Sequence, residues 1–279
     1  YISKVGDLQG AIAPALEATA IVRRLAMAQP EAFEGTLAGQ VNDLAMHLVQ
    51  AGKDQDALPL AHEAVERYRK LAQSHPAAHE QDLAISVHNL ANMLSRHGDN
   101  NALDMMREAV AIYRRLADAD PASHDSYLAG CLGSLSNMLC RIGDRQGALV
   151  AAKEAEMIYR RLALANPSAY ESDWALVLNT LAGRLSDVDD RYGALASAQG
   201  ATSIRRRLAQ DNATAHTADL AMSLGNLMQC QAAVGKLTDA REAGAEALAI
   251  FTTLAEQGSV EFEGYRATTL KRLQDLAPD

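Results

Sequence analysis

The sequence predicts an all-α fold, a right-handed α-solenoid of about six helical hairpins, and three observations lead to it. The first is composition. The chain has 279 residues, of which 48% are hydrophobic and only 4% aromatic, so alanine and leucine must fill most of its core. These two residues head the order of helix propensity, whereas strands favour β-branched and aromatic side chains.

The second observation is an internal repeat. The segment AIYRRLADADPASHDSYLAG, which begins at Ala111, has relatives in MIYRRLALANPSAYESDWAL from Met157 and ERYRKLAQSHPAAHEQDLAI from Glu66. Its leucine recurs at intervals of 46, 45, 46, 46 and 46 residues, and two alanines keep the same intervals. The three columns are Leu25, Leu71, Leu116, Leu162, Leu208 and Leu254; Ala11, Ala57, Ala102, Ala148, Ala194 and Ala240; and Ala18, Ala64, Ala109, Ala155, Ala201 and Ala247.

The third observation is that each period contains two helical patterns. Over residues 87–94, apolar residues at three- and four-residue spacing form the stripe of a first helix. Gly98 breaks this helix, and the deletion behind the single interval of 45 falls in the same turn, where it rotates no helix. A broader apolar face over 102–116 indicates a second helix, which ends before Pro121.

The predicted organisation is therefore a single solenoid over residues 1–279. Its hairpins are expected at 1–29, 33–75, 79–120, 124–166, 170–211 and 216–257, with a partial final helix over 262–277. Tyr1 is predicted to lie in the last turn of a first helix, and Asp279 near the end of another. We therefore expect a fragment of a longer protein, since solenoids normally carry polar caps; an intact mass of the native product near 30 kDa would contradict this expectation.

A further column carries a resemblance to a known family. A leucine is preceded three residues earlier by an aliphatic residue and is mostly followed by a small one, at Leu44, Leu90, Leu135, Leu181, Leu227 and Leu273. Together with the two alanine columns, this pattern resembles the tetratricopeptide repeat. The period exceeds the usual 34 residues, and Asn89-Leu90-Ala91 is similar to the long-helix variety found in kinesin light chain. The resemblance implies a stack of helical hairpins that binds protein or peptide partners, without identifying the partner.

Charge and cysteine content make several classes of protein unlikely candidates. The net charge of -9 opposes binding to a phosphate backbone, so no nucleic-acid partner is expected. The sequence has no run of eighteen apolar residues and no basic-then-apolar leader, which predicts a cytoplasmic protein with no membrane partner. Cys131, Cys140 and Cys230 lack the CxxC spacing, so neither a zinc site nor a disulfide framework is expected.

The residues that could carry chemistry have structural interpretations. Three histidines share one column of the repeat with phenylalanine and tyrosine, and this column is predicted to lie just before each first helix. We therefore interpret these histidines as packing residues and not as metal ligands. This column is Phe33, His79, His124, Tyr170, His216 and Phe262, and the next one, which suits a helix N-terminus, is Glu34, Glu80, Asp125, Glu171, Thr217 and Glu263. The segment from His62 to Glu66 lacks the second histidine of HExxH. We therefore expect no enzymatic activity and no cofactor.

Paired cations stand near the end of each second helix. They are Arg23-Arg24, Arg69-Lys70, Arg114-Arg115, Arg160-Arg161 and Arg205-Arg206-Arg207. Such cations favour the negative end of the helix dipole and can pair with nearby acids. We interpret them as a solvated ridge, with an anionic partner along the ridge as the alternative.

The candidate binding surface is the face of the first helices that points away from their own second helices, which in tetratricopeptide arrays lines the concave groove. It is poor in Lys and Glu and rich in Asn, Ser and Gly, so its amides suit a peptide backbone. The predicted groove residues are His88, Asn89, Asn92, Arg96, Ser134, Asn137, Arg141, Asn179, Thr180, Asn226 and Gln229. Close packing between neighbouring first helices is the alternative explanation for the small residues.

We accordingly predict a non-catalytic scaffold that binds a protein or peptide segment in this groove, with asparagines on the backbone and Arg96 and Arg141 on any acidic group. Two other functions remain open. One is a sensor or autoinhibitory domain of a multidomain signalling protein, such as a regulatory ATPase or transcription factor, which would bind a neighbouring domain of the same polypeptide or a small effector. The other is a structural solenoid that self-associates end to end.

Overall fold

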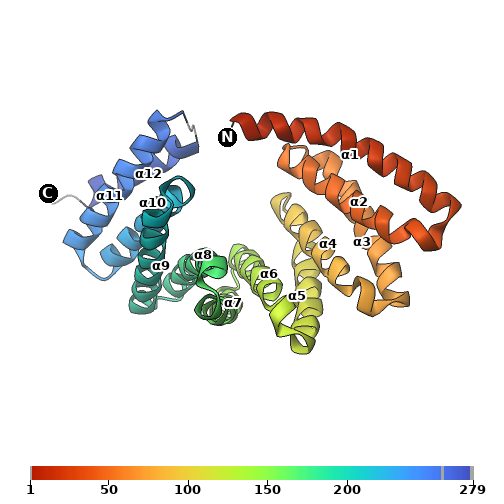
Figure 1. Cartoon of the computed structure of the whole chain (residues 1–279). Helices are drawn as coiled ribbons and strands as arrows, with labels where there is room; N and C mark the ends of the chain where they lie inside the picture. Colours follow the sequence, from red (N-terminus) through yellow and green to blue (C-terminus); the bar gives the residue numbers. More distant parts are fainter. Residues whose placement is uncertain (1, 259–260, 277–279) are drawn as a thin grey trace. The chain divides into compact units, whose positions relative to one another are not determined.

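The computed structural model describes residues 2–258 and 261–276, and the side chains of residues 2–9 and 11 are outside this description. The described residues form α-helices and turns, with no strand (Figure 1). Two compact units divide the chain, Tyr1–Met138 and Leu139–Asp279, and each is described by itself. A single continuous solenoid over residues 1–279 remains a prediction.

The helices follow the predicted alternation of first and second helices. The first helices are α2 (Pro30–Gln50), α4 (Pro76–Arg96), α6 (Pro121–Arg141), α8 (Pro167–Asp187), α10 (Ala213–Ala233) and α12 (Glu261–Asp275). The second helices are α1 (Ile2–Ala28), α3 (Asp54–Ser74), α5 (Ala102–Ala119), α7 (Arg145–Ala165), α9 (Arg191–Asp211) and α11 (Leu237–Glu256). This is the predicted all-α solenoid architecture, in which consecutive helices pack against one another from α1 to α5 and from α7 to α12.

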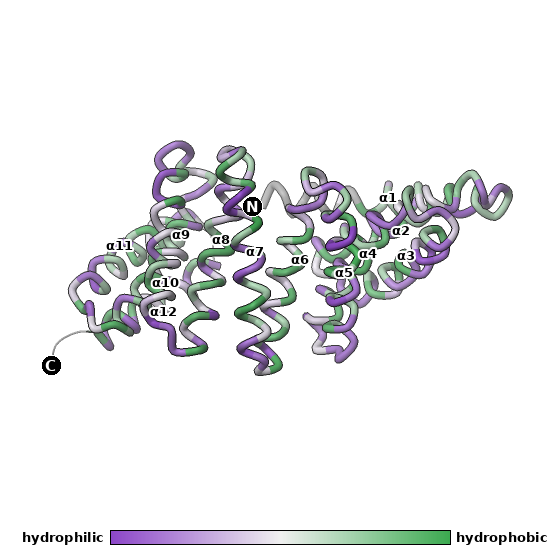
Figure 2. The backbone as a smooth tube through the Cα atoms, turned by 90° about the horizontal axis from the view of Figure 1, so that it is seen from below, coloured by the Kyte–Doolittle hydropathy of each residue, from purple (hydrophilic) through white to green (hydrophobic). Residues whose placement is uncertain are grey.

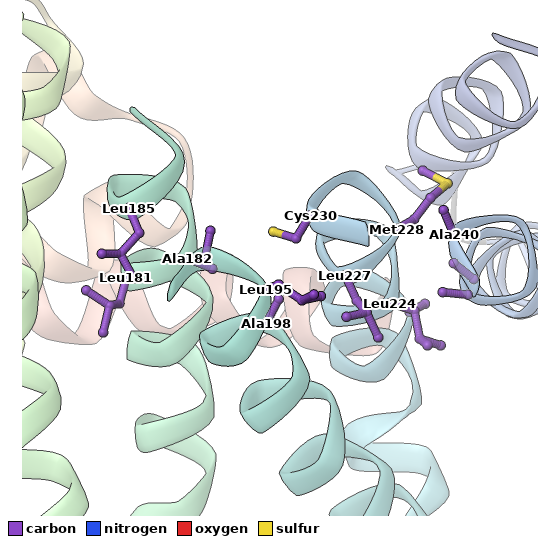
Figure 3. Close-up of a cluster of buried hydrophobic side chains, with 14 of the residues drawn as sticks. Leu181, Ala182, Leu185, Leu195, Ala198, Leu224, Leu227, Met228, Cys230 and Ala240 are labelled. Carbon is purple, nitrogen blue, oxygen red and sulfur yellow. The ribbon is translucent and has the colours of Figure 1, made fainter. Parts of the chain in front are cut away.

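Within each unit, the core lies between consecutive helices and not in one central cluster. In the first unit, α1 to α5 pack in sequence, and α2 also contacts α4. In the second unit, α7 to α12 do the same, and α8 also contacts α10. Figure 3 shows part of one core cluster, to which α8, α9, α10 and α11 each contribute buried side chains. Figure 2 shows the corresponding alternation of hydrophobic and hydrophilic stretches along each helix.

Alanine occupies the tightest positions between the helices. Ala64, Ala109, Ala155, Ala201 and Ala247 are all 0% exposed, so no larger side chain fits there without moving a helix. Ala18, the equivalent residue of α1, is only partly buried. The difference arises because no described first helix precedes α1.

A single residue connects each of the first five second helices to the following first helix. These residues are Gln29, His75, Asp120, Asn166 and Asn212, with φ between -138° and -148°. Proline follows in four of the five cases and begins the helix, because it lacks the N–H that would stay unpaired there. The ring column from Phe33 to Phe262 therefore lies in the first turn of each first helix, and the prediction that it lies just before the helix is wrong.

The turns inside the hairpins require a left-handed residue. Gly98 has φ +71°, and the equivalent position of the α8–α9 hairpin is Asp189, with φ 62°. After the turn, the Asp144 carboxylate caps α7 by accepting a hydrogen bond from the Gly147 N–H. A Cβ at Gly147 would lie 2.4 Å from this carboxylate, so a larger residue there would require the Asp144 side chain to shift.

Two sequence predictions concern the ends of the array. The predicted first helix ending near Tyr1 is not found: α1 is continuous from Ile2, and Tyr1 itself lies outside the described residues. Asp279 also lies outside the described residues, and α12 ends at Asp275.

Candidate functional site

The arginine pairs of the second helices make ion pairs within the chain. The first arginine of a pair reaches a glutamate on the next second helix: Arg23 to Glu63 at 2.6 Å, Arg69 to Glu108 at 2.7 Å and Arg206 to Glu246 at 2.5 Å. We call these the inter-repeat ion pairs. The hydrogen bond from Arg23 lowers the pKa of the Glu63 carboxyl, which keeps it charged.

The second arginine turns to the acid near the start of its own first helix. Arg115 pairs with Glu80 at 2.8 Å, and Arg207 pairs with Glu171. We call these the intra-hairpin ion pairs. Acids and arginines therefore neutralise one another along this face, which leaves little net positive charge for an anionic partner.

Arg160 is the exception among these described residues. It is exposed and has no acidic side chain within ion-pair distance, because Gly200 stands where the other repeats have glutamate.

Arg205 is not part of the solvated ridge, and its assignment to the row of paired cations is therefore wrong. Its 46-residue register places it in the column of Tyr68, Tyr113, Tyr159 and Phe251, and it is only 5% exposed. It pairs with Asp219 at 2.8 Å and donates a hydrogen bond to Ser172 at 2.7 Å. Burial raises the pKa of the neighbouring Asp173 carboxyl, because the charged form is poorly solvated there.

Equivalent positions elsewhere hold stacked rings. Tyr113 stacks on Tyr127 with ring centroids 5.5 Å apart, and Phe251 stacks on Tyr265 at 5.4 Å. The Arg205–Asp219 ion pair thus replaces an aromatic stack at the same position of the repeat.

On the first helices, several predicted groove residues bond to one another across neighbouring repeats. Asn89 Nδ2 lies 3.4 Å from Asn42 Oδ1, and His88 Nε2 lies 3.2 Å from Ser134 Oγ. In the second unit, Asn226 Nδ2 donates to the backbone oxygen of Asn179 at 3.2 Å. In each contact, a residue of one first helix bonds to the residue one position later in the register of the next first helix. We call these the first-helix polar contacts.

The first-helix polar contacts already use hydrogen-bonding groups that a ligand would need. Burial lowers the pKa of His88, so its ring is neutral at pH 7. The neutral ring forms a hydrogen bond with the Ser134 hydroxyl. Asn179 also donates to Ser223 Oγ at 2.7 Å. A ligand that used Asn89, Asn179 or Asn226 would have to compete with these bonds.

Other predicted residues are more accessible. Asn137 and Arg141 are exposed, and Asn92 is half-buried. Thr180 Oγ1 and Gln229 Nε2 each donate to a backbone oxygen of their own helix, at 3.2 Å. The predicted residues of each unit therefore do not converge on one point.

Three of them do line one recess in the first unit. Asn89, Asn92 and Arg96 of α4 face Met46 and Val49 of α2 across a cavity of about 360 Å³. Met93 and Ser95 complete the lining. Arg96 lies 3.5 Å from Asp54, so its charge is partly neutralised at the rim.

A matching recess lies in the second unit between α10 and α12. It has a volume of about 340 Å³ and is lined by Met228, Gln229, Ala232, Ala233, Arg272, Asp275 and Leu276. Its lining repeats that of the first recess in register: Gln229 is equivalent to Met46, Ala232 to Val49, and Arg272 to Asn89. Both recesses combine apolar walls with amide and guanidinium donors. We call them the first-helix recesses.

The predicted groove residues do not include the half of each recess that comes from the neighbouring first helix. Met46 and Val49 are absent from the prediction because it takes the groove residues of each repeat separately. The 46-residue period contained this information, because it relates the two walls of each recess. Met46 and Asn92 are one period apart, and so are Gln229 and Asp275.

The described residues offer neither a metal site nor a membrane span. Among them, no three or more His, Cys, Asp or Glu side chains are arranged to hold a metal ion. The ring column packs against aromatic residues instead, with His79 6.5 Å from Tyr68 and Phe262 6.1 Å from Phe251 between ring centroids. None of the described helices combines the length and apolar character needed to cross a membrane.

Comparisons with known proteins agree with this architecture. Residues 37–77 and 83–123 match the family model of the tetratricopeptide repeat. The crystal structure of BtubC (BKLC) from P. vanneervenii is similar, with a TM-score of 0.66, 23% identity, and coverage of 89% of this chain and 92% of that one. A putative kinesin light chain from Podosopora anserina, with nearly identical TPR-like repeats, gives a TM-score of 0.58 and 17% identity over 78% of this chain and 95% of that one.

No curated protein matches the chain in sequence. These comparisons show the fold, a helical-repeat array similar to those two solved structures, and a tetratricopeptide-repeat match over residues 37–77 and 83–123. Such repeat arrays are typically non-catalytic scaffolds for protein interaction.

Proposed function

We propose that the chain is a non-catalytic scaffold that binds an extended protein segment along its first helices. The observation that carries this proposal is the recurrence of the first-helix recess at the same repeat register in both units. Each recess has room for one large apolar side chain of a ligand, next to donors that suit its backbone or an acidic group.

The contacts within the chain change which residues we assign to the ligand. Asn89, Asn179 and Asn226 mainly fix the spacing of the first helices through the first-helix polar contacts. Asn92 and Arg96 in the first recess, and Gln229 and Arg272 in the second, are the proposed ligand-binding residues. Asn137 and Arg141 are exposed on α6 and remain candidates for the polar rim.

A phage-displayed library of random linear peptides, selected on the immobilised wild-type chain, tests the proposal. Selected peptides should bind with Kd values around 1 µM, equivalent to about -8 kcal/mol. Asn92→Ala combined with Arg96→Ala should raise Kd about tenfold for peptides that use the first recess. Ala232→Trp should block the second recess by filling it.

The matched control is Arg107→Ala, which removes an exposed arginine of the second helix α5 that pairs only weakly with Asp104, at 3.5 Å. Its Kd values should equal those of the wild type. Circular dichroism must show that each variant is folded. If all selected peptides bind the recess variants and the wild type equally well, the proposed site is wrong.

A further inference from the structure

The outward face of α7, in the middle of the array, carries three exposed apolar side chains in one line. Val150, Met157 and Leu164 are 58%, 69% and 72% exposed. They stand seven residues apart, so they follow one another over about 21 Å on the side of the helix opposite its buried alanines. We call these three residues the α7 stripe. Single exposed apolar residues are common, but several on one face indicate an interaction surface.

The repeat fold does not require apolar residues at these positions. Three other second helices have mostly polar or small residues there: Asp104, Ala111 and Asp118 on α5, Ala196, Ser203 and Gln210 on α9, and Glu242, Ala249 and Glu256 on α11. These helices take the same place in their hairpins as α7 does. Packing within the array therefore does not explain the α7 stripe.

Two cations flank the α7 stripe on one side. Lys153 and Arg160 are both exposed, and neither has an acidic partner within ion-pair distance among the described residues. On the other side of the stripe, Glu154 and Arg161 already interact within the chain. The charge that is left without a partner beside the stripe is therefore positive, although the whole chain has a net charge of -9.

The missing ion pair of Arg160 also leaves space between α7 and α9. Arg206, its equivalent in the next repeat, reaches Glu246 at 2.5 Å and so bridges α9 to α11. Gly200 takes the place of this glutamate on α9. A Cβ at Gly200 would have only Leu178 Cδ1 within 4 Å, at 3.4 Å. A ligand on α7 can therefore pair with Arg160 without displacing an acid of the chain.

The α7 stripe and its two cations together complement an acidic amphipathic helix. Apolar side chains at every seventh position of such a helix match the spacing of the stripe. The aliphatic stems of Lys153 and Arg160 extend the apolar surface, while their charges pair with carboxylates at its edge. The flexible side chain of Met157 lies at the centre, where it adapts to the shape of the ligand.

A second copy of α7 complements this face less well. In an antiparallel pair of α7 helices centred on Met157, Lys153 of one copy lies next to Arg160 of the other. In a parallel pair, Arg160 of one copy lies next to Arg161 of the other. Either orientation brings two basic side chains together, which opposes association.

We propose that the outward face of α7 is a second binding site, which takes an acidic amphipathic helix of a partner protein. The apolar residues of that helix cover the α7 stripe, and carboxylates along one of its edges pair with Lys153 and Arg160. This site lies on a second helix, so it is separate from the first-helix recesses and does not depend on peptide binding there.

A displayed library of helical peptides tests the proposal. Its members are helices of about 21 residues, long enough to cover the stripe, with leucine at every seventh position and Glu, Gln or Lys at the flanking positions. The library is selected on the immobilised wild-type chain after binders of Met157→Glu have been removed. The selected helices should carry acids along one edge and bind the wild type at least tenfold more tightly than Met157→Glu.

The matched control for this selection is Ala249→Glu, which places the same charge at the equivalent exposed position of α11. Its Kd values should equal those of the wild type. Both positions are exposed, so circular dichroism should show unchanged helix content in both variants. The proposal is overturned if no helix prefers the wild type over Met157→Glu, or if the selected helices carry lysine in place of acids.

Charge exchange tests the role of Arg160. Arg160→Glu should weaken the binding of a selected acidic helix about tenfold, and the same helix with lysines in place of its flanking acids should recover the loss. Gly200→Glu should also weaken binding, because the new carboxylate pairs with Arg160, whereas the matched Gly200→Gln should bind as the wild type does. Equal affinity of all these chains for the acidic helix would contradict the proposed pairing.

Sedimentation velocity without peptide tests whether a second copy occupies the stripe instead. The wild type and Met157→Glu should have the same mass at every concentration, since the stripe is not expected to bind its own copy. A wild-type dimer that Met157→Glu dissociates would assign the α7 stripe to self-association and overturn the proposed partner.

Discussion

At the scale of single residues, Arg205 shows how a repeat position can exchange one kind of interaction for another. Neighbouring repeats fill this position with a ring, stacked in two cases on a ring fourteen residues later. Here a guanidinium pairs with Asp219 and bonds to Ser172, while its Nε atom has no hydrogen-bond partner. Burying an ion pair brings little net stability, but removing one partner leaves the other charge uncompensated.

The effect of substitution on the free energy of unfolding should therefore depend on whether one or both partners of this ion pair change. Arg205→Leu should lower the free energy of unfolding by about 2–4 kcal/mol, less than for a fully buried pair because Asp219 is 33% exposed. Arg205→Tyr combined with Asp219→Tyr should be neutral or stabilising, since it recreates the stack of Tyr113 on Tyr127. Urea unfolding of both variants measures the difference. A double variant less stable than Arg205→Leu would show that the ion pair is the preferred arrangement.

The sequence contained the information needed to place Arg205. Counting 46 residues from Tyr159 leads to it directly. The run of three arginines obscured this register, because the run suggested one exposed cluster. Burial of a charged residue could not be predicted from residue type, since arginine is rarely buried without a partner.

At the scale of helices, the period determined the number and order of the elements, while the exact starts depended on capping. The predicted hairpin ranges exclude the prolines at 30, 76, 121 and 167, although their fixed φ suits the first position of a helix. The first helices α2, α4, α6 and α8 therefore begin three residues earlier than predicted. The recesses were harder to predict, because each one depends on side chains of two helices that are separated by a whole repeat.

Close helix packing gives a prediction at this scale. Ala109 is 0% exposed on α5, so Ala109→Leu should overpack the hairpin and cost about 1–3 kcal/mol of stability. Ala111→Leu is the matched control, because Ala111 is exposed on the same helix and should change stability by less than about 0.5 kcal/mol. Thermal unfolding of both variants distinguishes them. Equal melting temperatures would mean that the alanine column does not set the helix spacing.

At the scale of the whole molecule, ion pairs connect second helices along the chain, and the step from α7 to α9 lacks such a pair. Arg23, Arg69 and Arg206 each reach a glutamate in the next repeat, whereas Arg160 faces Gly200. Glycine within a helix also lowers its stability. The α7–α9 step therefore lacks both an ion pair and a good helix former.

Gly200→Glu should supply both. A Cβ at this position meets only the Leu178 Cδ1 atom, at 3.4 Å, so the substitution fits. We expect a gain of about 1 kcal/mol, of which most comes from helix propensity, and a melting temperature higher by roughly 2–4 °C. Gly200→Gln, the control, should retain the propensity gain without the charge. A loss of stability in both variants would show that this position needs glycine.

The one-residue connections between hairpins have a consequence for cleavage and insertion. Proteases and inserted domains both need an exposed, flexible stretch of chain. From α1 to α10, only single residues such as His75 and Asn166 separate one hairpin from the next, and each lies between two regular helices. A reporter domain or an engineered cleavage site should therefore be accommodated at the turns inside the hairpins, such as the one at Gly98, and rejected between them.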